Sequence, residues 1–342
     1  MGRAARALSA LPMTDEAQVD ALLEREPKNI EALVRKGELR EDVGDDRAAH
    51  AFYQAALSAA SAAQPLPQSM RPVIERAQAG IARGKVYFER QIERSLSESG
   101  FPPEKRPPRF QLSLDLMLGR KHTTLELQQP SSYFFPGLPQ RRYYERSELP
   151  WASEIEAAAP TIREELLAYL GGGEDGFSPY LVNDPTRPRS DFHGLVDNPD
   201  WSTLYLWEKG AKSAVTERFP TTFEAVNRLD LCRIGVRAPS ILFSRLAAGA
   251  RIPPHHGVMN ARLICHLPLT VPAGCGFRVG GETREWREGE LLVFDDSIEH
   301  EAWNRGTSDR IILIFDVWRP ELDLDERRAV TALFESVDSY SR

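Results

Sequence analysis

The stretch from Ile252 to Pro320 constrains the fold more than any other part of this 342-residue chain. It holds four of the seven histidines, which lie among short apolar runs separated by Gly, Pro and Asn-Arg-Gly turns. The runs 262–271, 290–294 and 310–317 are rich in Leu, Ile, Val and Phe, have the length of strands, and alternate with turns that fit hairpins. Such a series predicts an antiparallel double sheet of the jelly-roll or cupin type, whose mouth can hold a metal ion and a small ligand.

Composition limits the classes of protein that this chain can belong to. The net charge of −7 disfavours nucleic-acid binding, for which a basic patch is expected. Three cysteines, Cys232, Cys265 and Cys275, cannot all pair and form no Cys-x-x-Cys motif, so we expect reduced thiols in a reducing compartment. No run approaches the roughly 18 to 20 apolar residues of a membrane span, and the first residues lack the pattern of a secretory signal. We therefore expect a cytoplasmic protein that binds no membrane.

The N-terminal part is predicted to be a helical domain, residues 1–100. Residues 27–57 resemble a tetratricopeptide repeat in the spacing of small and apolar positions, although the consensus Trp, Tyr and terminal Pro are missing. Such a module binds a protein or peptide on its concave face; the alternative is a helical layer that packs on the second domain or on another subunit. Four prolines in the segment 101–108 disfavour both helix and central strand. We therefore predict a linker over residues 101–110 and a second domain over 111–342.

Several elements are expected between the linker and the histidine-rich stretch. Thr161 with Glu164 has the pattern of a capping box, which predicts the start of a helix there. Residues 201–207 alternate and are predicted to form a strand, with aromatic side chains that belong more often to a core than to a substrate platform. Residues 219–226 predict a short helix and residues 240–246 another strand. With the helical N-terminal domain, this gives an α+β fold.

Two histidines in the central stretch are positioned to converge. His255 follows a Pro-Pro turn and His300 follows the turn at Asp295-Asp296-Ser297, and in a jelly roll these positions face each other across the mouth of the barrel. A non-haem iron site normally adds a carboxylate to two histidines. The carboxylate is expected two residues after the first histidine, where this chain has Gly257. Taken alone, two histidines so far apart are more often structural than metal-binding.

Other polar residues strengthen the case for a ligand site. Arg310 begins the strand after His300, and a guanidinium matches both oxygens of a ligand carboxylate. Ser244, on the strand before His255, can donate one more hydrogen bond to such a group. Arg262 and His266 are four residues apart on one predicted strand, so they lie on the same face. An anionic ligand would explain two cationic or polar groups on an inward face.

The central motifs resemble the aspartyl/asparaginyl β-hydroxylase family. They are His255-His256-Gly257-x-x-Asn260-x-Arg262-Leu263-x-x-His266-Leu267, then Phe294-Asp295-Asp296-Ser297-x-Glu299-His300-Glu301-x-Trp303, then Arg310 and Asp316-Val317-Trp318-x-Pro320-Glu321-Leu322. The resemblance covers roughly residues 133–322 and implies a double-stranded β-helix that binds iron(II), 2-oxoglutarate and dioxygen. Members hold iron with two histidines and no carboxylate, so Gly257 agrees with the family pattern, as do helical repeats ahead of the catalytic domain.

The resemblance also implies roles for individual residues. His255 and His300 match the iron ligands. Ser244 and Arg310 match the groups that hold the distal carboxylate of 2-oxoglutarate, and His266 matches a residue near its other end. Arg262 is a candidate for binding the carboxylate or amide of the substrate, and Asp296, within the second motif, is a further candidate for substrate binding. The family can carry a second arginine two residues after the first, where this chain has Ile264.

Three functions remain open on the sequence. The resemblance implies hydroxylation of the β-carbon of an Asp or Asn residue in a peptide or protein, with succinate and carbon dioxide as products. The second possibility is the same chemistry on a free amino acid or other small acid, which Ile264 and the weak repeat consensus favour slightly. The third is a cupin-like binding or adaptor protein without turnover, which the joint presence of His255, His300, Ser244 and Arg310 disfavours.

Overall fold

The computed structural model describes residues 15–63, 65–122, 127–173, 175–184, 186, 188 and 192–340. The chain divides into two compact units, one of Met1–Gln91, Asn183–Ser190 and Ser339–Arg342, and the other of Ile92–Val182 and Asp191–Asp338. This division falls within a long helix, α4 (Arg71–Glu98), whereas the sequence placed a linker at 101–110. That Pro-rich segment contains a 3-10 turn, Pro103–Lys105, and leads directly into α5 (Pro108–Met117).

The first unit is helical, as the sequence predicts, with α1 (Glu16–Arg25), α2 (Ile30–Asp42), α3 (Asp46–Ala62) and most of α4. Helices α2 and α3 begin at side-chain caps, because Asn29 and Asp45 accept hydrogen bonds from backbone N–H groups of the first turn. The Tyr53 ring is buried against α2 and α4. A Cβ at Gly37 would lie 2.6 Å from this ring and one at Gly80 2.3 Å, so both positions must be glycine for the helices to pack.

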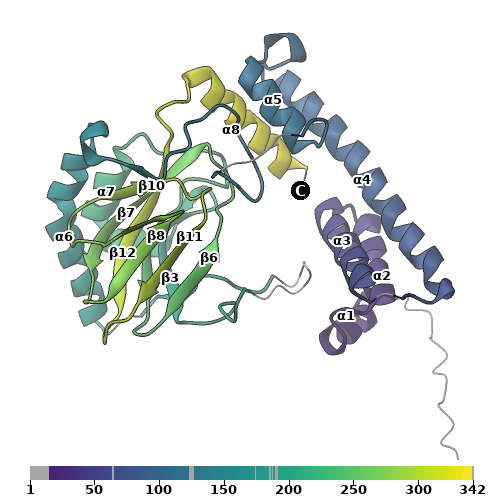
Figure 1. The fold of residues 1–342 in the computed structure, drawn as a ribbon, viewed down its shortest axis with the longest axis horizontal. Helices are drawn as coiled ribbons and strands as arrows, with labels where there is room; N and C mark the ends of the chain where they lie inside the picture. The colour runs from purple at the N-terminus through teal and green to yellow at the C-terminus, as the bar shows by residue number, and fades with distance from the viewer. Residues whose placement is uncertain are drawn as a thin grey trace, which may run out of the picture. The chain divides into compact units, whose positions relative to one another are not determined.

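The second unit contains two antiparallel sheets, which are visible in Figure 1. The larger sheet has the strand order β1-β10-β7-β12-β5-β3-β2, with β4 paired to β3, and the smaller has the order β6-β11-β8-β9. The strands of the larger sheet are β1 (Tyr143–Tyr144), β2 (Ser178–Pro179), β3 (Trp201–Glu208), β4 (Ala211–Lys212), β5 (Ile241–Leu246), β7 (Arg262–Thr270), β10 (Leu292–Phe294) and β12 (Arg310–Trp318). Those of the smaller sheet are β6 (Arg251–His255), β8 (Cys275–Val279), β9 (Glu282–Arg284) and β11 (His300–Asn304).

These sheets confirm the α+β class and the predicted strands. The expected runs 201–207, 240–246, 262–271 and 310–317 each correspond to one strand within two residues of the predicted ends. The run 290–294 is shorter as a strand, since β10 begins at Leu292 and the preceding residues form a turn.

Alternation along the strands creates two different faces on the larger sheet. On β12, Ile311, Leu313, Phe315 and Val317 belong to a core that also contains residues of α6 (Ala152–Gly171) and α7 (Pro220–Asn227). The intervening residues, from Arg310 to Asp316, line a cavity on the opposite face. Figure 1 shows α6 and α7 along one side of the strands, with β6, β8 and β11 on the other side. One sheet face therefore stabilises the fold and the other forms the site.

The helices of this unit differ from the sequence prediction at one point. Helix α6 begins at Ala152, so Thr161 lies within it and the predicted capping box at Thr161 and Glu164 is wrong. The helix continues past Pro160, because its apolar positions Ile155, Ala159 and Ile162 are buried in the core beside the sheet. Helix α7 agrees with the predicted short helix at 219–226.

The last helix, α8 (Leu324–Ser339), follows β12 and is joined to α5 by the ion pair of Glu326 with Arg109 (3.4 Å). Across the residues that the structure describes, helices long and apolar enough to cross a bilayer are absent.

Candidate active site

A cavity of about 350 Å³ lies between the two sheets. The larger sheet contributes inward residues of β5, β7, β10 and β12, and the smaller sheet contributes residues of β6, β8 and β11. All predicted site residues line this cavity, namely Ser244, His255, Arg262, His266, Asp296, His300 and Arg310. The predicted residues, which extend from Ser244 to Arg310 in the sequence, are thus brought into one space.

His255 and His300 face each other at the end of a strand pair. They are register partners on β6 and β11, and their ring centroids are 4.1 Å apart. The Nδ1–H of His255 donates to the carbonyl oxygen of Pro253 (2.8 Å), and that of His300 donates to the carbonyl oxygen of Ile298 (3.0 Å). Each hydrogen bond fixes the tautomer that keeps the Nε2 lone pair available as a ligand.

Burial keeps both imidazoles neutral, which is the form that binds metal ions. It lowers the pKa of His300 to about 3, with a smaller contribution from His255, and it also lowers the pKa of His255. Within the described residues, groups of three or more His, Cys, Asp or Glu side chains arranged to hold a metal are absent. The pair therefore offers fewer protein ligands than the usual two histidines and one carboxylate, and leaves more coordination positions for other ligands.

Arg310 is a buried cation that lacks a counter-charge in the described part of the chain. The residue is only 1% exposed, and its Nε–H has no hydrogen-bond partner there. No carboxylate among the described residues forms an ion pair with it, and its guanidinium carbon lies 4.9 Å from the centre of the uncharged Trp286 ring. Burial lowers the pKa of Arg310 to about 10, so the group is charged at neutral pH. A buried charge of this kind needs an anionic partner.

Two further residues of the larger sheet line the cavity beside Arg310. Ser244 is buried on β5, the strand that pairs with β12. His266 is buried on β7, where Trp286 Nε1–H donates to its Nδ1 (3.3 Å) and the rings of Phe277 and Phe294 pack against it. Burial holds the pKa of His266 well below its usual value. A hydroxyl, a guanidinium and a neutral imidazole therefore converge on a space suited to a small oxoacid.

Arg262 occupies another part of the cavity and already has two acidic partners. Its Nη1 forms an ion pair with Asp316, and its Nη2 lies 3.2 Å from Asp296 Oδ2. All three side chains are at most 13% exposed. Burial raises the pKa of Asp296 to about 7 and also raises that of Asp316, while Arg262 opposes both shifts.

The carboxylate of Asp296 fills the space beside Gly257. A Cβ at position 257 would lie 2.0 Å from Asp296 Oδ2, and the Gly257 N–H donates to the Asp296 carbonyl oxygen (2.6 Å). This explains why a side chain is absent two residues after His255. Asp296 Oδ1 is buried and has no hydrogen-bond partner among the described residues.

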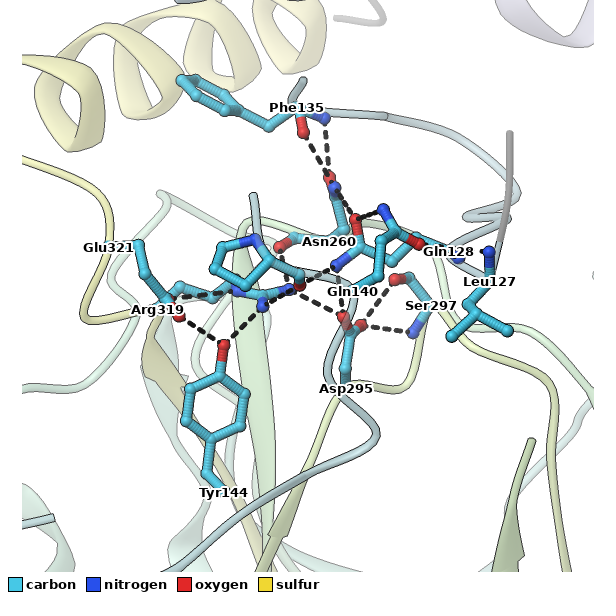
Figure 2. Close-up of polar contacts among 11 residues, drawn as sticks. Leu127, Gln128, Phe135, Gln140, Tyr144, Asn260, Asp295, Ser297, Arg319 and Glu321 are labelled. Carbon is cyan, nitrogen blue, oxygen red and sulfur yellow. Dashed lines mark hydrogen bonds and ion pairs between the residues drawn. The ribbon is translucent and has the colours of Figure 1, made fainter. Parts of the chain in front are cut away.

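A buried polar network, shown in Figure 2, holds the segments on which the two histidines lie. Arg319 and Asp295, both 0% exposed, form an ion pair of 2.6 Å. Gln128 Nε2–H donates to the same Asp295 oxygen (2.6 Å), and Gln128 Oε1 accepts from Asn260 Nδ2–H (3.0 Å). Tyr144 completes the network by contacting both Arg319 and Glu321.

This network connects four separate parts of the chain, one of them the segment of Arg319 after β12. Asp295 lies in the turn before His300, Asn260 lies in the loop after His255, and Gln128 belongs to a segment more than a hundred residues earlier. The early segment also bonds to both loops through its backbone, since Ser131 N–H donates to the Gly257 carbonyl (2.8 Å) and Gln129 N–H to the Ser297 carbonyl (2.6 Å). The spacing of the histidine loops is therefore set from outside the strands.

Several cavity residues were not found from the sequence. Asp316 was noted only within a motif, and the aromatic residues that line the cavity beside the histidines were not proposed for the site, namely Tyr180, Phe192, Trp201, Phe277, Trp286 and Phe294. A core position was predicted for Trp201, and the residue is only 9% exposed. It also lines the cavity, where its ring stacks on Tyr180 with centroids 4.2 Å apart. Alternation on 201–207 was the available signal, but it does not say which face meets the cavity.

Comparisons with known proteins show which families this chain resembles. Residues 156–320 match the family model described as Aspartyl/Asparaginyl beta-hydroxylase. A human "Aspartyl/asparaginyl beta-hydroxylase" is 32% identical over 220 residues, which cover 60% of this chain and 26% of that protein. The "Ornithine lipid ester-linked acyl 2-hydroxylase" of Rhizobium tropici is 32% identical over 181 residues, covering 52% of this chain and 60% of that protein. The chain thus spans less than two thirds of the length of either relative.

A solved structure, the "Schizosaccharomyces pombe Cnp3 Cupin Domain", overlaps 35% of this chain and 66% of its own, with 8% identity and a TM-score of 0.24. Agreement at this level is too low to support any argument about the site.

Proposed function

We propose that this protein, whose residues 156–320 match the aspartyl/asparaginyl β-hydroxylase family model, is an iron(II)- and 2-oxoglutarate-dependent dioxygenase. The family is one of 2-oxoglutarate-dependent hydroxylases. The observation that carries the proposal is a buried Arg310 without a carboxylate partner, in the same cavity as two imidazoles whose Nε2 atoms are free of protein hydrogen bonds among the described residues. A dicarboxylate that binds a metal at one end and a cation at the other supplies what both groups lack.

Each chemical requirement of this reaction has a residue in the cavity that fits it. His255 and His300 would hold the iron, and Arg310 with Ser244 would bind the distal carboxylate of 2-oxoglutarate. His266, neutral and buried, would contact the other end of the cosubstrate. Iron(II) with 2-oxoglutarate and dioxygen supplies the oxidising chemistry, with succinate and carbon dioxide as co-products. The chain itself orients the ligands and excludes water with the aromatic rings of the cavity wall.

For the substrate, we propose the β-carbon of an Asp or Asn residue in a peptide or protein. The name of the human relative supports this class. The same chemistry on a free amino acid or small acid is the second candidate. A cavity of about 350 Å³, lined mostly by apolar side chains, is compatible with it, and the Rhizobium relative is named as a lipid hydroxylase. A binding or adaptor protein without turnover is disfavoured, because all the groups that the cosubstrate needs line one cavity.

The helical unit would serve to present or bind a protein partner. Its helices support this, and we propose a tetratricopeptide-like module in a cytoplasmic protein. The three cysteines are free thiols, in keeping with a reducing compartment.

The dioxygenase proposal is tested by ligand binding without oxygen. Mixing the full-length protein with iron(II) and 2-oxoglutarate is expected to give the weak visible charge-transfer band of an iron(II)–oxoacid chelate. His300→Ala should abolish the band, whereas Arg310→Ala should retain metal binding and raise the required 2-oxoglutarate concentration about 10- to 100-fold, the cost of one charged hydrogen-bond pair. A band that survives in His300→Ala would refute the ligand assignment, and its absence in the native protein with iron bound would favour the binding-protein alternative.

A further inference from the structure

The cavity holds two guanidinium groups among the described residues that line it, and neither is available to an acidic substrate under the proposed function. Arg310 is the group assigned to the cosubstrate. Arg262, the first residue of β7, is bound to Asp316 through Nη1 and to Asp296 through Nη2. Above the pKa of about 7 that burial gives Asp296, one positive and two negative side chains thus form a cluster with a formal charge of −1.

This negative cluster is poorly screened. The side chains of Asp316 and Asp296 are 1% and 8% exposed and that of Arg262 is 13% exposed, so solvent does little to weaken the field that they create in the cavity. Like charges brought together in such an environment repel strongly. A substrate carboxylate placed here would face two carboxylates and would share the single guanidinium with both.

The wall between the two guanidinium groups offers no further cation. Alternation along β7 and β12 places Ile264, Ile312 and Ile314 on the cavity side, between Arg262 and His266 on one strand and between Arg310 and Asp316 on the other. Leu242 on β5 continues the same apolar surface. This wall suits the methylene and backbone atoms of a substrate and offers nothing to an anion.

One acceptor in this region lacks a donor. Asp296 Oδ1 is buried, lines the cavity and has no hydrogen-bond partner among the described residues. A neutral amide carries two N–H donors and no charge, so it satisfies this oxygen without adding to the negative cluster. A carboxylate has no proton to donate at neutral pH.

We propose that the hydroxylated residue carries an uncharged amide, as asparagine does, and that an aspartate at the same position is rejected. The inference rests on the proposed dioxygenase function and narrows it. Asp296 and Asp316, with Arg262 held between them, are the residues that determine the specificity. The cosubstrate retains sole use of Arg310.

The test uses two pools of synthetic peptides that have the same random flanking residues and differ only in a central Asn or Asp. Full-length protein with iron(II) and 2-oxoglutarate is equilibrated with both pools without oxygen, at pH 8, above the pKa of about 7 that burial gives Asp296. Bound peptides are then identified by mass spectrometry, and a second sample is exposed to air and examined for addition of one oxygen at the central residue. We expect the Asn pool to be enriched and hydroxylated roughly tenfold or more over the Asp pool.

Equal use of the two pools, preference for Asp, or no enrichment of either pool would overturn the amide assignment. The charge-transfer band of the same samples reports on the dioxygenase proposal independently. A normal band with a preference for Asp leaves that function intact and removes only the specificity inference. Binding without oxygen can be read even if turnover or the band is absent.

Two variants test whether charge is the cause. Ile264→Arg adds a cation to the apolar wall next to Arg262 and is expected to move the Asn-to-Asp ratio toward Asp, whereas Ile264→Met, similar in size and uncharged, is expected to leave the ratio unchanged. Asp316→Asn removes one negative charge while keeping the shape, and should move the ratio in the same direction as Ile264→Arg. A ratio that does not respond to either charge change would show that the cluster does not set specificity.

Discussion

The absence of a side chain at position 257 leaves room for the carboxylate of Asp296 beside the loop that follows His255. Asp296 reaches this space from the turn before His300, and its Oδ2 would be 2.0 Å from any Cβ at position 257. Glycine is therefore required by the close approach of another side chain. The sequence showed the absence of a carboxylate in the expected place, but the identity of the residue that fills the space depends on tertiary structure.

We predict that Gly257→Ala lowers the free energy of unfolding by about 1–3 kcal/mol, the usual range for added volume in a packed site. The added methyl group should also displace Asp296 and weaken iron binding. The Asp296 carbonyl oxygen accepts the Gly257 N–H, and Gly257 lies in the loop that follows His255. Gly257→Asp should weaken iron binding as well, since the Asp296 carboxylate already fills the space that the added side chain would need. Chemical denaturation and metal titration of the purified variants measure both effects.

Gly281→Ala is the matched control for this experiment. Apart from its chain neighbours, none of the described residues has an atom within 4 Å of the Cβ it would add, so its unfolding free energy should stay within about 0.5 kcal/mol of the native value. Iron binding that becomes tighter in Gly257→Asp would contradict the packing argument and show that the position can accept a third ligand.

At the scale of elements, the strands were predictable because alternation is a local property. Every second residue lines the cavity over 262–266 of β7 and 310–316 of β12, so Arg262 and His266 were expected on one face and are found there. The start of α6 was not predictable in the same way. Thr161 and Glu164 have the capping pattern, but burial of Ile155 and Ala159 extends the helix to Ala152.

The polar network of Figure 2 could not be predicted from local pattern, since Gln128, Asn260, Asp295 and Arg319 come from four distant segments. Gln128 also lies before residue 156, where the match to the family model begins. Nothing in the periodicity of the sequence shows that a glutamine in a loop will become fully buried. The histidines themselves were found because their chemistry and spacing are visible in the sequence.

We predict that Gln128→Leu weakens iron binding in addition to lowering stability. The change leaves Asp295 and Asn260 each without one buried hydrogen-bond partner, which costs about 1–3 kcal/mol of unfolding free energy. Both of those residues lie in the loops next to the two histidines proposed to bind iron, so the loops should lose their spacing. Metal titration and chemical denaturation are measured on the same preparation.

Ile162→Val provides the comparison. Ile162 is fully buried in α6, within the core beside the other face of the sheet, and its substitution should cost about 0.5–1.5 kcal/mol. We expect its iron affinity to match that of the native protein. If both variants lose iron affinity in proportion to stability, the network has a structural role and does not position the site.

For the whole molecule, the division into two units predicts where ligands stabilise the chain. Every residue that lines the cavity belongs to the unit of Ile92–Val182 and Asp191–Asp338. A ligand stabilises only those states that contain its binding site, by about 2.7 kcal/mol when its concentration is a hundred times the dissociation constant.

Iron(II) and 2-oxoglutarate should therefore slow hydrogen exchange of the most protected amides in β6, β7, β11 and β12 by up to about 100-fold. Exchange in α2 and α3 is expected to be the same with and without ligands, as measured by mass spectrometry under anaerobic conditions. His255→Ala should remove the protection in the strands, which distinguishes specific binding from a general effect of the additives. Protection that extends to α2 and α3 would contradict independent unfolding of the two units and would mean that occupancy of the site is coupled to the helical unit.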